Sequence, residues 1–276
     1  MTSKQMASFL SMSIFVVLPE LMAQINPPPI GRPMPVNLGR GVQLELVWIR
    51  PGEFDMGSVY KRPKGLAPMD IIRVALYVNE EPVHRVKITQ GFWLGKYEVT
   101  VEQYELIMGK RNSKAYTNLR DPVSSVTWND AQEFLKKLND MRCLPAGVKC
   151  RLPTEAEWEY ACRGGTTTAY YNGDRASNAS AIAWFGCGKL HPVGQKQPNS
   201  FGLYDMLGNA DEWCADVYKK YSETGSSDQA ETTTDQERVV RGGSCYSRAD
   251  DVRVSARHSE KPSGHGGFRV CCSVVP

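Results

Sequence analysis

Two acidic residues, Asp205 and Glu212, flank a Gly208-Asn209 turn in the second half of the 276-residue chain. Carboxylates and main-chain carbonyls are the hard oxygen donors that calcium prefers, and the carbonyls of such a turn can converge on one ion. The residues therefore suit a calcium site. The alternative is that both carboxylates are ordinary turn residues, hydrated at the surface.

Other common catalytic patterns are missing from the sequence. The chain carries four histidines, His84, His191, His258 and His265, and none belongs to a Ser-His-Asp nucleophile elbow. It contains no Walker loop and no dinucleotide-binding fingerprint. The net charge is +3 and no basic run exceeds Lys-Lys, so we expect no nucleic-acid partner.

A short, well-capped helix is predicted around Trp158. Thr154 and Glu157 form a capping box at its start, and Gly164 ends it. Because an indole on the apolar face of such a helix packs into a core, we expect Trp158 to be a core anchor, and we expect the same of Trp213. These residues on their own indicate a structural helix and no chemistry.

Two more helices and several short strands are expected around it. One helix follows Thr100, which pairs with Gln103, and the other follows Thr127 as N-cap, with Asp130 in its first turn. Strands are expected at residues 44–49, 53–57, 85–89, 92–99, 253–257 and 267–271, and the first two are expected to form a hairpin.

The N-terminal residues indicate export. Residues 1–23 have the pattern of a signal peptide, with Lys4, an apolar run too short to span a bilayer, and Ala23 before the cleavage point. Residues 24–41 form a proline-rich leader, and residues 42–276 form one domain. We expect a periplasmic, cell-surface or secreted protein with no transmembrane segment. A frayed apolar terminus of a cytosolic protein is the alternative.

Eight cysteines in an exported chain allow disulfides. Their spacings match neither a zinc ribbon nor a redox Cys-x-x-Cys motif. At Cys271-Cys272 we expect one buried thiol and one disulfide partner, and a vicinal pair is the alternative. The sequence alone does not give the pairing.

Several blocks, taken in order from about residue 42 to residue 271, resemble the formylglycine-generating enzyme family, also called the sulfatase-modifying factor family. The matching blocks are Val47-Trp-Ile, Phe54-x-Met-Gly-Ser58, Glu81-Pro-x-His84, Glu98-Val-Thr100, Pro122-Val-x-x-Val-x-Trp128-x-Asp-Ala131, Arg151-Leu-Pro-Thr-Glu-Ala-Glu-Trp-Glu-Tyr160, Pro198-Asn-x-Phe-Gly-Leu-Tyr-Asp-Met206, Gly208-Asn-x-x-Glu-Trp213, Arg241-Gly-Gly-Ser244 and Gly267-Phe-Arg269. One block alone would be weak, whereas the ordered set is specific.

The resemblance implies an α+β fold: one loop-rich domain of the formylglycine-generating type, related to the C-type lectin fold. It also implies a structural calcium ion bound by the side chains of Asp205 and Glu212 and by the carbonyls of Gly208 and Ala210. The family's second calcium loop is not convincingly matched. Asn178 corresponds to one of its ligands, but no acidic partner follows at the required place.

The copper chemistry of the family depends on two cysteines shortly after Gly-Gly-Ser, because soft thiolates bind copper(I). In this chain Ser247 and Val252 stand at those two positions, the loop is shortened, and Cys245 is its only thiol. We therefore expect no copper site and no formylglycine-generating activity. The iron sulfoxide synthases of the superfamily need a His-x-x-x-His-x-Glu motif, which the sequence does not contain.

Two classes of function remain. Variable proteins of diversity-generating retroelements share this scaffold and vary surface residues between Gly-Gly-Ser and Gly-Phe-Arg. The equivalent window here is rich in Tyr, Ser, Arg, Asp and His, which make adaptable contacts to a protein or peptide ligand. The candidate ligand-binding residues are Cys245, Tyr246, Ser247, Arg248, Asp250, Asp251, Ala256, His258, Ser259, Ser263, Gly264 and His265. The alternative is a formylglycine-generating-type oxidoreductase or another enzyme that modifies proteins or peptides.

Overall fold

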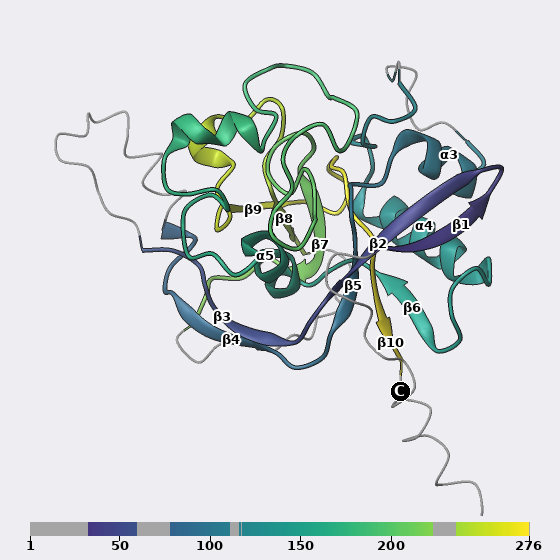
Figure 1. The fold of residues 1–276 in the computed structure, drawn as a ribbon, viewed down its shortest axis with the longest axis horizontal. Helices are drawn as coiled ribbons and strands as arrows, with labels where there is room; N and C mark the ends of the chain where they lie inside the picture. Colours follow the sequence, from purple (N-terminus) through teal and green to yellow (C-terminus); the bar gives the residue numbers. More distant parts are fainter. Residues whose placement is uncertain (1–32, 60–77, 111–115, 117, 223–235, 276) are drawn as a thin grey trace, which may run out of the picture.

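The computed structural model describes residues 33–59, 78–110, 116, 118–222 and 236–275. Short strands and helices are joined by long irregular segments (Figure 1). This arrangement confirms the predicted α+β, loop-rich fold. The predicted signal peptide and most of the predicted leader lie outside the described residues.

The largest sheet has five antiparallel strands in the order β1-β2-β5-β10-β6. Their bounds are β1 (Met34–Gly39), β2 (Val42–Ile49), β5 (Phe92–Gly95), β10 (Cys271–Val274) and β6 (Val148–Arg151). Because β1 is paired with β2, the prediction that the leader extends to residue 41 is wrong. Regular structure begins at Met34, where Val36 and Leu38 contribute apolar side chains to the core.

Two smaller sheets complete the strand pairing. The first pairs β3 (Gly52–Met56) with β4 (His84–Ile88), and the second has the order β7-β8-β9, with bounds Glu212–Val217, Arg238–Arg241 and Arg257–Glu260. The predicted hairpin of the strands at 44–49 and 53–57 is therefore wrong, since β3 pairs with β4. The two predicted closing strands are displaced, because β9 and β10 begin where those predictions end.

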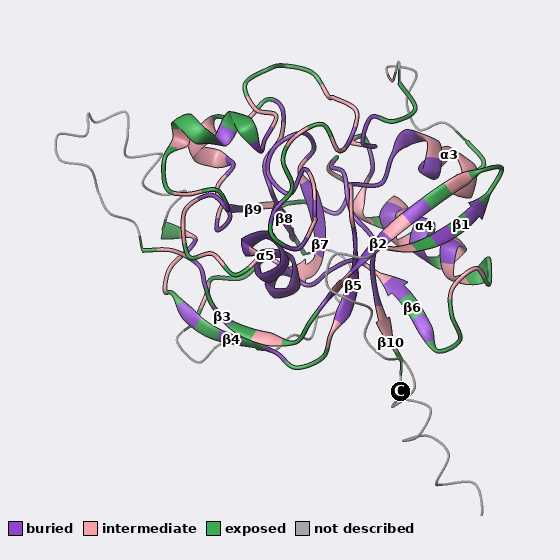
Figure 2. Ribbon diagram, viewed as in Figure 1, coloured by how far each residue is buried: buried purple, intermediate pink, exposed green. Residues whose placement is uncertain are grey.

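The three α-helices among the described residues begin as the sequence indicates. They are α3 (Val101–Met108), α4 (Trp128–Asp140) and α5 (Glu155–Arg163), and each starts with a capping box. All nine residues of α5 are buried, as Figure 2 shows for the helix near the centre of the view. Two short 3-10 helices, η2 (Ala176–Ala181) and η3 (Ala249–Asp251), lie together in the irregular part of the domain.

The five-stranded sheet separates two hydrophobic cores. Leu94 and Cys271 face the core around α5, whereas Trp93 and Cys272 face the core that α3 and α4 cover. Successive residues of a strand point to opposite faces, which is why adjacent residues serve different cores. Trp158 lies in the first core and Trp213 in the second, and both side chains are 0% exposed.

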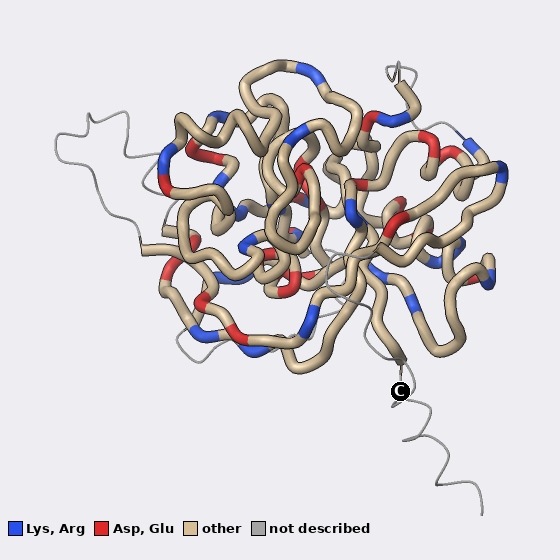
Figure 3. The backbone as a smooth tube through the Cα atoms, viewed as in Figure 1, with Lys and Arg blue, Asp and Glu red and all other residues tan. Residues whose placement is uncertain are grey.

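A disulfide between Cys150 and Cys272 joins β6 to β10, while Cys271 is a buried free thiol. This matches the expectation of one disulfide partner and one buried cysteine. Basic and acidic residues are interspersed along the described chain (Figure 3). None of its helices combines the length and the apolar character needed to cross a membrane.

Candidate functional site

The Glu212 carboxylate at the start of β7 accepts hydrogen bonds from two side chains, those of Arg269 and Trp158. Arg269 donates from Nε to Oε2 at 2.7 Å and from Nη2 to Oε1 at 2.5 Å, and the Trp158 indole N–H donates to Oε2 at 2.7 Å. All three side chains are buried. Glu212 therefore belongs to a buried ion pair, and the alternative of a hydrated turn carboxylate does not describe it.

Asp205 is also buried, at 1% exposure, and its backbone has a left-handed φ of 51°. Its Oδ2 accepts a hydrogen bond from the Gly194 N–H at 2.6 Å, whereas Oδ1 has no hydrogen-bond partner among the described residues. Burial raises the pKa of Asp205 to about 6, and the Arg269 guanidinium opposes that rise. An orphaned carboxylate oxygen in the interior is a candidate ligand for a cation.

Glu98 is the third buried carboxylate of the region. It accepts hydrogen bonds from Asn209 Nδ2 and from the Ala210 N–H, both at 2.9 Å. Burial raises its pKa well above the ordinary value, and the charges of Asp205 and Glu212 raise it further. Three carboxylates thus share the Arg269 guanidinium as their common basic neighbour.

The predicted calcium ligands fit this region in part. Asp205 offers the unpartnered Oδ1, and Glu212 accepts three hydrogen bonds where a carboxylate has about four acceptor positions. Gly208 has a φ of 75°, and a Cβ there would lie 2.2 Å from the Trp184 carbonyl oxygen. In the part of the chain that is described, no group of three or more His, Cys, Asp or Glu side chains is arranged around a metal position.

Two arginines, one just before the candidate contact window and one within it, pair with carboxylates of α5. Arg241, just before the window, donates to Glu155 at 2.9 Å and to Glu159 at 2.7 Å. Arg257, in its second half, donates to Glu155 at 2.6 and 2.8 Å. These ion pairs are buried, so residues 242–256, which lie between the two arginines, start and end at fixed points.

Ser247 and Val252, the residues at the family's copper-ligand positions, both pack against Gly243. A Cβ at Gly243 would lie 2.9 Å from Val252 Cγ1 and 3.2 Å from Ser247 Oγ. Ser247 Oγ accepts a hydrogen bond from the Ser244 N–H at 2.9 Å, and Val252 is fully buried. The hydroxyl and the isopropyl group therefore close a tight turn.

The candidate contact residues differ in exposure. Cys245 is 0% exposed, so its inclusion as a contact residue is wrong: its side chain packs inward under the loop. Tyr246 is 74% exposed. Arg248, Ser263 and His265 are exposed, and the partly buried candidates are Ser247, Asp250, Asp251, Ala256, His258, Ser259 and Gly264.

Residues 209–211 bring two parts of the window together. The Cys245 N–H donates to the Asn209 carbonyl at 2.9 Å, and His258 Nε2 lies 3.8 Å from Asp211 Oδ2. Ser259 does not join this group. It follows His258 in β9 and so points to the opposite face, where its hydroxyl donates to Glu237 at 2.6 Å.

A segment that the sequence reasoning missed lies beside Tyr246. The N–H groups of Cys187 and Gly188 donate to the Cys245 carbonyl at 2.9 and 3.1 Å, and the Gly186 N–H donates to the Ser247 carbonyl at 2.9 Å. The pKa of Cys245 is raised to about 11, mainly by burial and next by the nearby Cys187. A second thiol therefore stands close to Cys245, although it comes from another loop.

The same segment carries an aromatic stack. The rings of Trp184 and His191 lie 3.6 Å apart at an interplanar angle of 9°, and Lys196 Nζ lies 3.7 Å from the Trp184 ring centroid. Burial lowers the pKa of His191, and so do the nearby charges of Lys189 and Lys196. The imidazole and the indole thus stack on each other in the loop beside the contact window. In the sequence, this part of the site was indicated only by a Trp, a Cys and a His within a Gly-rich loop.

Solved structures show which class of fold this is. Treponema denticola variable protein 1 superposes with a TM-score of 0.70 at 24% identity, covering 87% of this chain and 98% of that chain. The likeness confirms the fold. Residues 38–274 match the model of the sulfatase-modifying factor enzyme 1-like domain, and the chain therefore belongs to that family.

Curated relatives agree with the family. The formylglycine-generating enzyme of Streptomyces coelicolor is 38% identical over 171 residues, covering 54% of this chain and 51% of that protein. Serine/threonine-protein kinase pkn1 of Chlamydia pneumoniae is 30% identical over 262 residues, covering 83% of this chain and 38% of that protein. The chain thus spans about half of the first relative and well under half of the second.

Proposed function

We propose that this chain is an exported binding protein, which holds a protein or peptide ligand on the face around Tyr246. The observation that carries the proposal is the contrast between a fixed backbone and the exposed side chain of Tyr246. Four main-chain hydrogen bonds of 2.9–3.1 Å hold Cys245 and Ser247 to Asn209 and to residues 186–188, while Tyr246 between them is 74% exposed. A rigid loop with an exposed aromatic residue loses little entropy on binding.

The neighbouring side chains suit recognition of a polar partner. Arg248 and His265 are exposed hydrogen-bond donors, and Asp250 and His258 are partly exposed. Tyrosine supplies contact area, and the charged groups around it select the partner. Scaffolds that position loops in this way commonly carry function on the loops.

The proposal is tested by capture of a partner from the exported fraction of the native cells. Tyr246, Arg248, Asp250 and His258 are changed together to Ala, and circular dichroism checks that the domain is folded. Loss of the captured protein is the expected result. Equal capture by the wild type and this variant would remove the proposal.

A matched control variant changes four exposed positions outside the window to Ala. These are Lys136, Asp140, Met141 and Lys149, in and after α4 and in β6. The control also removes four side chains, Met141 standing for Tyr246 and three charged residues for the other three. It should capture the partner as well as the wild type does.

A second candidate function is an oxidoreductase of the formylglycine-generating type. The observation that favours it is the second thiol, because Cys187 is hydrogen-bonded through its backbone to Cys245 and two thiolates are the ligands that copper(I) prefers. Mass spectrometry of a sulfatase-motif peptide after incubation with copper, reductant and air reads this activity. We expect no formylglycine. Its formation by the wild type and loss in Cys187→Ser and Cys245→Ser would establish the enzyme instead.

Calcium is proposed as a structural ion held by Asp205, Gly208, Ala210 and Glu212. The unpartnered Asp205 Oδ1 in a buried, carboxylate-rich region supports it. When bound, the ion would supply charge neutralisation and loop order, and no chemistry.

Export is proposed from the signal-peptide pattern of residues 1–23. N-terminal sequencing of protein from the native cells should find Gln24 as the first residue. An intact Met1 in a cytosolic fraction would contradict export.

A further inference from the structure

A cleft of about 480 Å³ opens between the start of β3 and the C-terminal end of α5. Its volume falls within the range of about 300–1,000 Å³ that small-molecule sites occupy. None of the candidate contact residues around Tyr246 lines it, so it is independent of the proposed binding face.

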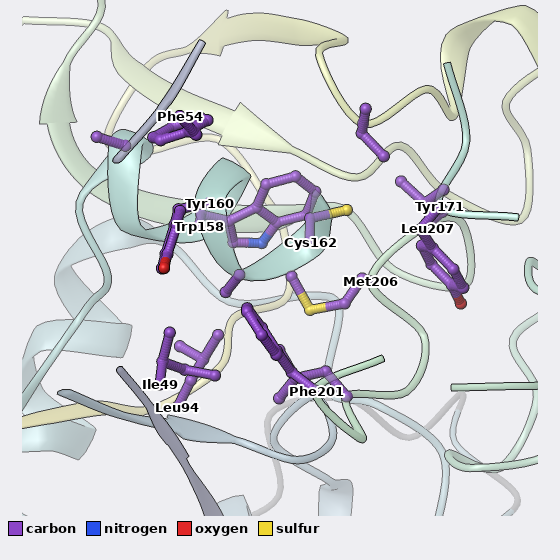
Figure 4. Packing of buried hydrophobic residues seen from close by; sticks show 14 of the residues in the cluster. Ile49, Phe54, Leu94, Trp158, Tyr160, Cys162, Tyr171, Phe201, Met206 and Leu207 are labelled. Atoms are coloured by element: carbon purple, nitrogen blue, oxygen red, sulfur yellow. The ribbon is translucent and has the colours of Figure 1, made fainter. Parts of the chain in front are cut away.

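The floor of the cleft is aromatic. The Tyr160 ring lies 5.4 Å from the Phe54 ring and 6.1 Å from the Phe201 ring, measured between centroids. Figure 4 shows Tyr160 between these two side chains. Each of the three residues is 8% exposed, so each presents a small edge to the cleft. Such a floor favours a planar ring, which gains from offset or edge contacts with aromatic neighbours.

The Tyr160 hydroxyl is the polar group of this floor, on a residue that is 8% exposed and lines the cleft. Gly52 lies beside this oxygen, and the lack of a side chain there leaves room for the hydroxyl. A Cβ at Gly52 would lie only 2.2 Å from the oxygen. Burial raises the pKa of Tyr160, so the hydroxyl keeps its proton and can donate it to a ligand.

One cation of the cleft is available and the other two are engaged. Arg85 donates to Asp55 at 3.1 Å and lies 3.5 Å from Glu53. Arg163 is held by Glu159 and by the Gly57 carbonyl. Arg50 is exposed and has no ion pair within the described part of the chain, and its charge acts on the Tyr160 hydroxyl.

We propose that the cleft binds a small aromatic carboxylate. The ring lies against Phe54 and Phe201, and the carboxylate accepts hydrogen bonds from the Arg50 guanidinium and the Tyr160 hydroxyl. Arginine matches a carboxylate with two parallel donors, and the hydroxyl completes the hydrogen bonding of the second oxygen. A carboxylate gains a charged partner in Arg50, and the carboxylates of Glu53 and Asp55, which also line the cleft, disfavour a dianion.

The test is isothermal titration calorimetry with N-acetylphenylalanine, compared with N-acetylphenylalaninamide, which has the same ring but no charge. The acid should bind about tenfold or more tightly than the amide, as expected for one charge-assisted hydrogen bond. Arg50→Gln and Tyr160→Phe should each weaken the acid and leave the amide nearly unchanged. Arg248→Gln, on the face around Tyr246, is the matched control and should change neither affinity.

Three results would overturn the proposal: no binding of the acid at millimolar concentration, equal binding of acid and amide, or an unchanged affinity in Arg50→Gln. Arg50 is exposed, so this variant is expected to fold. A thermal midpoint equal to that of the wild type shows that the variant is folded. Because partner capture by the Tyr246 face is a separate measurement, either proposal can fail without the other.

Discussion

Arg269 donates hydrogen bonds to both carboxylate oxygens of Glu212, from Nε at 2.7 Å and from Nη2 at 2.5 Å. Both side chains are buried. The pair joins the segment before β10 to the start of β7. It also supplies the positive charge that Glu98 and Asp205 share.

Removing this cation should destabilise the domain strongly. Arg269→Met leaves the buried Glu212 carboxylate without its cationic partner, which typically costs about 3–5 kcal/mol of unfolding free energy. Urea denaturation measures it. Arg85→Met is the control, because Arg85 pairs with Asp55 at the surface and exposed pairs contribute about 0–1 kcal/mol. Equal effects of the two changes would contradict the role given to Arg269.

Calcium should raise the thermal midpoint. Binding to the native state alone adds about 2.7 kcal/mol at a hundred times Kd. EGTA should lower the midpoint, and calcium should restore it. Magnesium should not restore it, because magnesium requires near-ideal octahedral coordination, which irregular loops do not provide. Asp205→Ala should abolish the response, and Asp140→Ala, at the exposed end of α4, should keep it. A wild type indifferent to EGTA and calcium would rule out the site.

Trp158 and Trp213 should anchor the two cores. Replacing either by Ala should lower the free energy of unfolding by about 3–5 kcal/mol, since both indoles are fully buried. Tyr246→Ala, at an exposed position, should change it by less than about 0.5 kcal/mol. A tryptophan variant that keeps native stability in denaturant titration would show that the indole serves some other purpose.

Asp216 should make stability depend on pH. Its carboxylate accepts the Glu155 N–H at 2.7 Å, and burial, aided by the Glu155 charge, raises its pKa from 3.8 to about 7. The folded state therefore keeps a proton that the unfolded state releases. The stability that this proton contributes to the folded state is complete below about pH 4 and is lost as the pH rises through about 7.

Asp216→Asn should remove that part of the pH dependence, because the amide does not titrate. Denaturant titrations at about pH 5 and about pH 8 should show the wild type losing stability relative to the variant at the higher pH. If wild type and variant change in parallel between the two pH values, Asp216 is not the group responsible.

The helix starts were predictable from sequence because their determinants are local. Thr154 and Glu157 are three residues apart, and the capping box they form needs no tertiary contact. Strand partners depend on distant segments instead. The sequence suggested that the strands after Leu44 and Glu53 pair with each other, whereas β2 lies between β1 and β5. Tertiary packing decided the pairing.

The candidate site was predictable to a smaller extent. The family blocks located Asp205, Glu212 and the loop around Tyr246, but they did not reveal that Arg269 pairs with Glu212. The nearness of Cys187 to Cys245 was equally hidden, because it arises from main-chain hydrogen bonds between two irregular loops. No periodicity or spacing records such a contact.

Site-specific photo-cross-linking at position 246 tests most directly whether this face binds a partner. A benzophenone amino acid replaces Tyr246 in the cells that make the protein naturally, and Met141, 39% exposed after α4, is the control position. Illumination should give a discrete cross-linked species from position 246 and none from position 141. The same products from both positions, or none from position 246, would contradict the account.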